Sequence, residues 1–187
     1  MTLLGVDVGL GACGWAVIGD DASIVDLGVL LQSPDTTVDE STDRARRAAN
    51  QAELLVDVAQ RHGCSAIAAE AMSFGGPPAA RFHMAISVGL SWGVVTGVAH
   101  TLGLALYSVA PKLWQRAVVP DGPKRLLYAQ VEATLTAYAK RHIKAEVSLA
   151  MIAKGNRNHA LDAGGVGLFV TLRPTQADRI IARRAVA

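Results

Sequence analysis

The sequence predicts an α/β fold in which helices flank a central mixed sheet of five strands, three antiparallel strands followed by parallel ones. Three observations predict it. The chain opens with three apolar runs joined by short turns, a long amphipathic helix follows, and each of two further apolar runs comes after a helical segment. The 187 residues fit one domain, 1–187, with a basic tail from about residue 173 to 187.

The first three predicted strands cover residues 2–8, 12–18 and 24–31. Each is an apolar run, and glycine-containing or Asp-Asp turns separate them. Strands joined by such short links pair antiparallel, so we expect a meander. Ser33-Pro34 ends it, because proline does not continue a paired strand.

The segment from Asp39 to Arg61 is predicted to be one long helix. Its apolar residues recur three and four positions apart and form a single stripe. Gly63 stands where a C-terminal helix cap is expected. Residues 64–69 then form a short apolar strand that ends at Glu70. A helix between two strands predicts that this strand is parallel to its neighbour in the sheet.

The second half of the chain predicts helices with one more strand. Three glycines near its end, Gly164, Gly165 and Gly167, cost about 1 kcal/mol each relative to Ala inside a helix, which predicts an irregular last helix. In order, the predicted elements are a loop at 72–78, a helix at 81–102, a strand at 104–109, helices at 112–119 and 124–141, and a last helical stretch that holds His159 and Asp162.

The charge is distributed unevenly along the chain. Residues 1–70 hold eleven acids against four arginines, a net charge of −7, whereas residues 71–187 hold fourteen basic residues against five acids, a net charge of +9. A basic half on a nearly neutral protein suggests a polyanionic partner or an ordinary solvated surface, and both remain open.

The cysteines and the N-terminus bear on the compartment. Cys13 and Cys64 form neither a disulfide framework nor a metal-binding spacing, which favours a reducing, cytoplasmic location. The first ten residues, MTLLGVDVGL, carry no basic residue before the apolar run and contain Asp7. They are therefore not expected to be a signal peptide.

No acid, lysine or arginine occurs from Met84 to Ala110, a length that could span a bilayer. Polar residues interrupt this segment, and Gly103 predicts a helix end before the strand. We therefore favour a buried helix followed by a strand over a membrane helix. Gly89, Gly93 and Gly97 lie four apart on one face of the helix. This ridge of small residues predicts either tight packing inside the monomer or a subunit interface.

Four side chains are candidates for chemistry. Asp7 lies in an apolar strand and Glu70 ends another, and a carboxylate in such a place is costly unless it is paired or bound to a metal. His159 and Asp162 are three residues apart, so they share one face of a helix. Together the four would make an oxygen-rich site for a hard divalent cation.

Each of the four has a structural alternative. Asp7 could accept hydrogen bonds from the glycine-containing turn that follows it, and Glu70 could pair with an arginine of the core. A single histidine such as His159 is most often an ordinary surface or core residue. Their joint placement, two acids at strand ends and a pair on a late helix, favours the metal site.

Three motifs resemble those of the RuvC-type Holliday junction resolvases, which have the RNase H-like fold. The motifs are LLGVDVGLGACGWAVI, AIAAEAMSF and NHALDA. They resemble the family's first strand with its Asp, its second carboxylate strand, and its last helix with an acid or histidine followed three residues later by an Asp. The resemblance runs from Leu3 to about Phe169. Val8 stands where the family often has Pro and Cys13 where it often has Thr, which indicates a divergent branch, viral or from a mobile element.

The resemblance implies a Mg²⁺-dependent crossover-junction endodeoxyribonuclease with two ions per active site, for which Mn²⁺ can substitute. Asp7 would lie between the ions, Glu70 and Asp162 would hold one each, and His159 would complete the set or orient the water. Two ions can activate a water and stabilise the leaving oxygen of a phosphodiester.

The resemblance also implies branched DNA and a second copy of the chain as partners. Phe74, or else Met72, would insert at the junction centre, and the alternative is that Phe74 covers the core. The Gly89, Gly93 and Gly97 ridge would lie at the interface of a homodimer. Lys112 and Lys124 resemble basic residues near the family's site. Generic candidates for phosphate contacts are Arg81, Arg125, Lys140, Arg141 and Lys144.

Three rival functions remain open. An RNase H-like nuclease that acts on flaps, forks or RNA–DNA hybrids would use the same four residues. A sugar-kinase or acetate-kinase type of ATPase also begins with a strand, an Asp and a glycine turn, but it needs a chain about twice this length. A DNA-binding scaffold without catalysis would bind junctions and leave them uncut.

Overall fold

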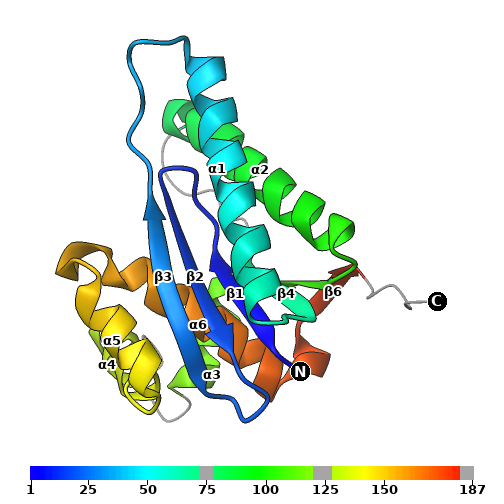
Figure 1. The fold of residues 1–187 in the computed structure, drawn as a ribbon, viewed down its shortest axis with the longest axis vertical. Helices are drawn as coiled ribbons and strands as arrows, with labels where there is room; N and C mark the ends of the chain where they lie inside the picture. The colour runs from blue at the N-terminus through cyan, green and yellow to red at the C-terminus, as the bar shows by residue number, and fades with distance from the viewer. Residues whose placement is uncertain (72–77, 120–127, 182–187) are drawn as a thin grey trace.

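The computed structural model describes residues 1–71, 78–119 and 128–181, and Figure 1 shows how their elements are arranged. The order of strands and helices follows the prediction except for an additional helix, Ile143–Met151, and a last strand, Asp178–Ile181, and most other bounds agree within a few residues. The elements are β1 (Leu3–Asp7), β2 (Ala12–Ile18), β3 (Ile24–Leu31), α1 (Glu40–Arg61), β4 (Ala66–Glu70), α2 (Pro78–Thr101), β5 (Ala105–Val109), α3 (Pro111–Val118), α4 (Tyr128–Ala139), α5 (Ile143–Met151), α6 (Arg157–Leu172) and β6 (Asp178–Ile181), with 3-10 turns at Lys154–Asn156 and Pro174–Gln176.

The strands form one mixed sheet in the order β3-β2-β1-β4-β5-β6. β1, β2 and β3 pair antiparallel, while β1, β4 and β5 pair parallel, which confirms the predicted mixed sheet. β6 adds a sixth strand, antiparallel to β5, inside the segment predicted to be a tail. Four residues are too short to give a periodic signal. Because β1 and β4 are parallel, their last residues, Asp7 and Glu70, lie at the same edge of the sheet.

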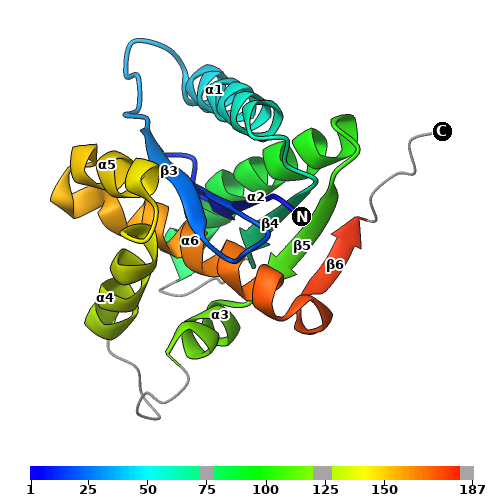
Figure 2. The same cartoon turned by 60° about the horizontal axis from the view of Figure 1, so that its bottom comes forward.

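Two helical layers cover the sheet on opposite sides (Figure 2). α1 and α2 pack against each other and bury Leu55, Trp92 and Val95 against one face of the sheet. α6 crosses the other face, with α3, α4 and α5 around it, and buries Trp114 and Phe169 there. Both faces of the sheet are therefore apolar and covered, as expected for a sheet with crossover helices.

α6 lies unusually close to the sheet because two strand positions have no side chain. A Cβ on Gly5 of β1 would lie 2.0 Å from the carbonyl oxygen of Ala163, and one on Gly14 of β2 would lie 2.0 Å from that of His159. Atoms in ordinary contact are 3.4 to 4 Å apart. Only glycine at these positions lets the helix backbone rest on the strands.

The expectation of an irregular last helix is wrong, since α6 runs unbroken from Arg157 to Leu172. Its three glycines are buried and make room for neighbouring side chains. A Cβ on Gly165 would lie 2.5 Å from Trp114, and one on Gly167 would lie 2.6 Å from Ile18. Tertiary packing thus outweighs the low helix propensity of glycine.

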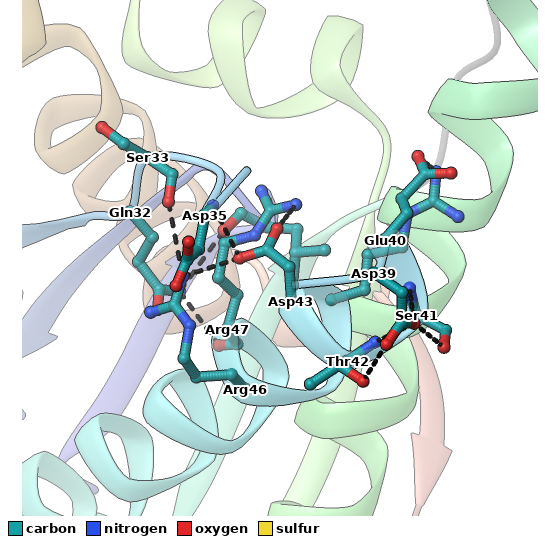
Figure 3. Close-up of polar contacts among 12 residues, drawn as sticks. Gln32, Ser33, Asp35, Asp39, Glu40, Ser41, Thr42, Asp43, Arg46 and Arg47 are labelled. Carbon is teal, nitrogen blue, oxygen red and sulfur yellow. Dashed lines mark hydrogen bonds and ion pairs between the residues drawn. The ribbon is translucent and has the colours of Figure 1, made fainter. Parts of the chain in front are cut away.

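Acidic side chains organise the start of α1 (Figure 3). Asp39 caps the helix, because its carboxylate accepts hydrogen bonds from two amides of the first turn at 3.0 Å each. Asp43 forms ion pairs with Arg46 and Arg47 at 2.7 Å each and accepts a hydrogen bond from the amide of Asp35. These contacts attach the connection between β3 and α1 to the helix.

A second polar cluster lies at β3, the outermost strand on one side of the sheet, and joins this strand to neighbouring helices. Asp26 of β3 is buried and accepts a hydrogen bond from the hydroxyl of Ser148 at 3.0 Å. Its other oxygen lies 2.9 Å from the ammonium of Lys144 and 3.2 Å from Nε2 of His62. One carboxylate therefore contacts both α5 and the C-cap residue of α1.

α2 carries the uncharged segment, and the predicted helix and strand are confirmed. Within the described part of the chain, α2 is the one helix long and apolar enough to cross a bilayer, with a mean hydropathy of 1.2 over Met84–Thr101. Only 28% of that window is buried, so the helix is less buried than expected. One face, with Trp92 and Val95, packs into the core, and the opposite face lies on the surface.

The glycine ridge of α2 lies on that surface. Gly89, Gly93 and Gly97 are exposed, and a Cβ on any of them would meet no atom of the described residues within 4 Å. The ridge therefore makes no tight packing contact with the part of the monomer that the structure describes.

Candidate active site

The first carboxylate and the histidine are in direct contact. Asp7 is the last residue of β1, and His159 lies in the first turn of α6. Nδ1 of His159 lies 2.7 Å from Oδ2 of Asp7. An ionised carboxylate only accepts, so the imidazole donates this hydrogen bond. Gly14, which pairs with Asp7 across the β1–β2 ladder, allows the approach because it leaves room for the backbone of His159.

This contact changes the protonation of the histidine. The hydrogen bond to Asp7 raises the pKa of His159, burial opposes the rise, and the negative charges of Asp7 and Asp162 reinforce it. The side chain of His159 is 31% exposed and that of Asp7 is 17% exposed, so solvent reaches both groups. The pair can therefore exchange protons with water.

The second carboxylate is more enclosed. Glu70 ends β4, and burial raises its pKa, while the hydrogen bond from Trp114 opposes the rise and the charge of Asp7 adds to it. The indole Nε1 of Trp114 donates to Oε1 of Glu70 at 3.0 Å. Burial and a neighbouring acid both disfavour the charged form of a carboxylate, and a bound cation would stabilise that charged form.

Asp162 lies one turn after His159 on α6 and is half-buried. Its negative charge contributes to the raised pKa of His159, and the charge of Asp7 contributes to the raised pKa of Glu70. The structure thus brings Asp7, Glu70, His159 and Asp162 to one end of the sheet, where Asp7 and His159 are in direct contact.

The donor chemistry of this set fits a hard divalent cation, which prefers carboxylate oxygens and tolerates one imidazole. The desolvated Glu70 beside Asp7 is the structural observation that favours a cation here. Among the residues described, no group of three or more His, Cys, Asp or Glu side chains is arranged so that it could hold a metal ion as it stands. One candidate ligand oxygen, Oδ2 of Asp7, is occupied by its hydrogen bond with His159.

Comparison with solved structures gives the architecture a name. RuvC of Thermus thermophilus in complex with a Holliday junction substrate is 18% identical, with 96% of this chain and 99% of that chain covered and a TM-score of 0.73. A second Thermus thermophilus RuvC structure is 19% identical, covering 96% and 100%, with a TM-score of 0.71. This chain has the RuvC fold.

A more distant structure shares the same architecture. The yeast mitochondrial Holliday junction resolvase Ydc2 is 10% identical, with 90% of this chain and 77% of that chain covered and a TM-score of 0.62. No protein-family model matches the chain, and no curated protein matches its sequence. The likeness to these solved structures is therefore one of fold.

The RuvC fold leaves the predicted DNA-contacting residues in different environments. Lys112 lines a cavity of about 310 Å³ together with Arg116 and Arg173. The ammonium group of Lys144 forms an ion pair with Asp26. Arg141 stacks on the ring of Tyr138, 4.3 Å from its centre, and Lys140 lines a second cavity on α4 and α5. Met72, Phe74, Lys124 and Arg125, and the side chain of Arg81, lie outside the described residues.

Two residues at this site were missed by the sequence analysis, Trp114 and Gly14. Trp114 is a large aromatic residue inside a short basic helix, an unusual place that could have drawn attention to it. Gly14 follows Cys13 in an apolar strand, where glycine weakens a strand and often marks a close approach of another backbone.

Proposed function

We propose that this protein is a structure-selective endonuclease that resolves four-way DNA junctions by hydrolysing phosphodiester bonds with divalent cations. The hydrogen bond between His159 of α6 and Asp7 of β1, beside the desolvated Glu70, carries the proposal. It joins the two parts of the chain whose motifs resemble those of junction resolvases, on a fold shared with RuvC.

In this proposal Asp7, Glu70 and Asp162 would hold Mg²⁺. When bound, the ions activate water and stabilise the leaving oxygen. His159 would orient the attacking water and take up the proton that this water loses. Nδ1 is engaged by Asp7, so we assign the proton transfer to Nε2, the other ring nitrogen.

DNA contacts follow the distribution of charge. The cavity on α3 is lined by Lys112, Arg116 and Arg173, with no acidic residue among its lining residues, and suits a backbone phosphate. Lys140 and Arg141 lie farther along the chain and would contact another arm. Lys144 is the weakest candidate, because a phosphate would have to compete with Asp26 for its ammonium group.

We also propose a homodimer that pairs through α2. The exposed Gly89, Gly93 and Gly97 ridge carries no charge and would allow two helices to approach closely. A twofold dimer would present two active sites to a twofold junction.

The decisive experiment compares Asp7→Asn and Glu70→Gln with the unchanged protein on a synthetic four-way junction, a flap and a linear duplex, with and without Mg²⁺. Both variants should lose cleavage and keep junction binding, since each keeps its shape and loses a ligand charge. Asp57→Asn, at an exposed ion pair on α1, is the matched control. Retained cleavage in either site variant would defeat the assignment.

The substrate panel separates two of the rival functions, another nuclease and a non-catalytic scaffold, from the resolvase. Preference for flaps, forks or RNA–DNA hybrids over the junction would replace the resolvase proposal with another RNase H-like nuclease. Binding of the junction by the unchanged protein without any Mg²⁺-dependent cleavage would indicate a non-catalytic scaffold.

The wedge role of Phe74, or of Met72 in its place, has its own test. Phe74→Ala should slow cleavage of junctions more than it weakens binding, because an inserted ring distorts the DNA after it has bound. An equal loss of binding and cleavage would argue against this role.

A further inference from the structure

Trp114 contacts the candidate site through Glu70. It lies in α3 and is completely buried. Its indole nitrogen has one hydrogen to donate, and a buried donor without an acceptor is costly. Oε1 of Glu70, 3.0 Å away, is that acceptor. The ring is thus attached to a carboxylate on another element of the fold.

The other side of the ring rests on α6. A Cβ on Gly165 would lie 2.5 Å from Cε3 and 2.6 Å from Cζ3 of Trp114, and 3.4 Å from Leu135 of α4. Any residue larger than glycine would therefore displace the ring. α6 is the helix that carries His159 and Asp162. Trp114 therefore contacts both α6 and Glu70, the last residue of β4.

A hydrogen bond to one carboxylate oxygen fixes the rotation of the whole group. The last torsion of a glutamate side chain is broad, and without a partner the carboxylate samples many orientations. With Oε1 held by the indole, Oε2 keeps one direction. Partners that orient a ligand in this way typically change metal affinity or activity by about 10- to 100-fold.

We propose that Trp114 is a positioning residue, which holds Oε1 of Glu70 so that the second oxygen is directed toward the cation site, with Gly165 keeping the indole in place. This inference rests on the proposed function. It adds a role for α3 and explains why α6 keeps a glycine three residues after Asp162, where alanine would form a better helix.

The first test is Trp114→Phe, which removes the N–H and keeps an aromatic ring. Trp92→Phe is the matched control, because the indole Nε1 of Trp92 is also buried but has no hydrogen-bond partner among the described residues. We expect Trp114→Phe to bind Mn²⁺ about 10- to 100-fold more weakly in calorimetric titrations of the DNA-free protein, and Trp92→Phe to bind within about twofold of the unchanged protein. Equal Mn²⁺ affinity in Trp114→Phe would overturn the proposal.

Cleavage gives a second readout. Single-turnover cleavage by Trp114→Phe should need a higher Mg²⁺ concentration for half its maximal rate, while junction binding without metal stays unchanged. If the unchanged protein cuts no branched DNA, the proposed function fails, but the Mn²⁺ titration still decides the role of Trp114.

The third readout is independent of metal and folding yield. In the ¹⁵N–¹H spectrum, the indole resonance of Trp114, identified by its loss in Trp114→Phe, should move and exchange faster with solvent in Glu70→Ala. It should be unchanged in Asp57→Asn. An indole resonance that does not change in Glu70→Ala would overturn the proposal.

Gly165→Ala tests the role of the glycine. This variant keeps the indole donor and displaces the ring, so it should lower Mn²⁺ affinity, as Trp114→Phe does.

Discussion

Gly14→Ala offers a sharp test of how the active site is assembled. The added Cβ would lie 2.0 Å from the carbonyl oxygen and 2.3 Å from the carbonyl carbon of His159, whereas ordinary contacts begin at 3.4 Å. Both are backbone atoms, so no side-chain rotation relieves the clash. The first turn of α6 must therefore move away from β2 by about 1 Å or more.

That movement acts on the contact at the centre of the site. The 2.7 Å hydrogen bond between His159 and Asp7 would lengthen beyond hydrogen-bonding range. A misplacement of about 1 Å costs about 100-fold in rate when it affects reacting groups. Overpacking costs about 1–3 kcal/mol of the free energy of unfolding. For a domain of this size, this loss lowers Tm by about 2 to 12 °C.

Two measurements check this prediction. Circular dichroism melts give Tm, and single-turnover cleavage of a four-way junction, run well below the Tm of the variant, gives the rate. Gly155→Ala is the control, because a Cβ there meets no described atom within 4 Å. A Gly14→Ala protein with unchanged Tm would refute the close approach. A lower Tm with an unchanged rate would refute the link between α6 and catalysis.

Two other predictions concern the edge of the sheet and the surface of α2. Burial alone would raise the pKa of Asp26, but the contacts with Lys144 and Ser148 outweigh it and lower the pKa. Its carboxylate therefore stabilises the fold above the unfolded pKa of about 3.9, and this contribution is lost as pH falls through the lower folded pKa. The difference in Tm between the unchanged protein and Asp26→Asn should accordingly be largest above about pH 5 and shrink toward pH 3; a difference that grows in acid would contradict the assigned sign. Gly93→Leu, whose side chain would meet no atom of the described residues at its Cβ, should leave Tm of the monomer unchanged or raise it, because leucine is the better helix former, and should shift the molar mass measured by light scattering from dimer to monomer. A Gly93→Leu protein that stays dimeric would place the interface elsewhere.

Much of the fold could be predicted from local patterns. The spacing of apolar residues in α1, the short turns between the first strands and the apolar run before Glu70 each report burial on one element, and burial is what the sheet and its layers require. The same reasoning missed β6, because four residues carry no period. It also overestimated the burial of α2, because composition does not reveal which face another element covers.

The sequence by itself determined which residues could do chemistry: acids at the ends of two apolar strands, and a histidine and an acid on one face of a late helix. Their meeting was decided by the tertiary structure. Parallel pairing places Asp7 and Glu70 at one edge, and the missing side chains of Gly5 and Gly14 let α6 bring His159 to Asp7. The role of Gly165 is of the same kind. Its propensity predicts a weak helix, and only the packed ring of Trp114 shows why glycine is needed there, since close contact between distant segments leaves no local trace in the chain.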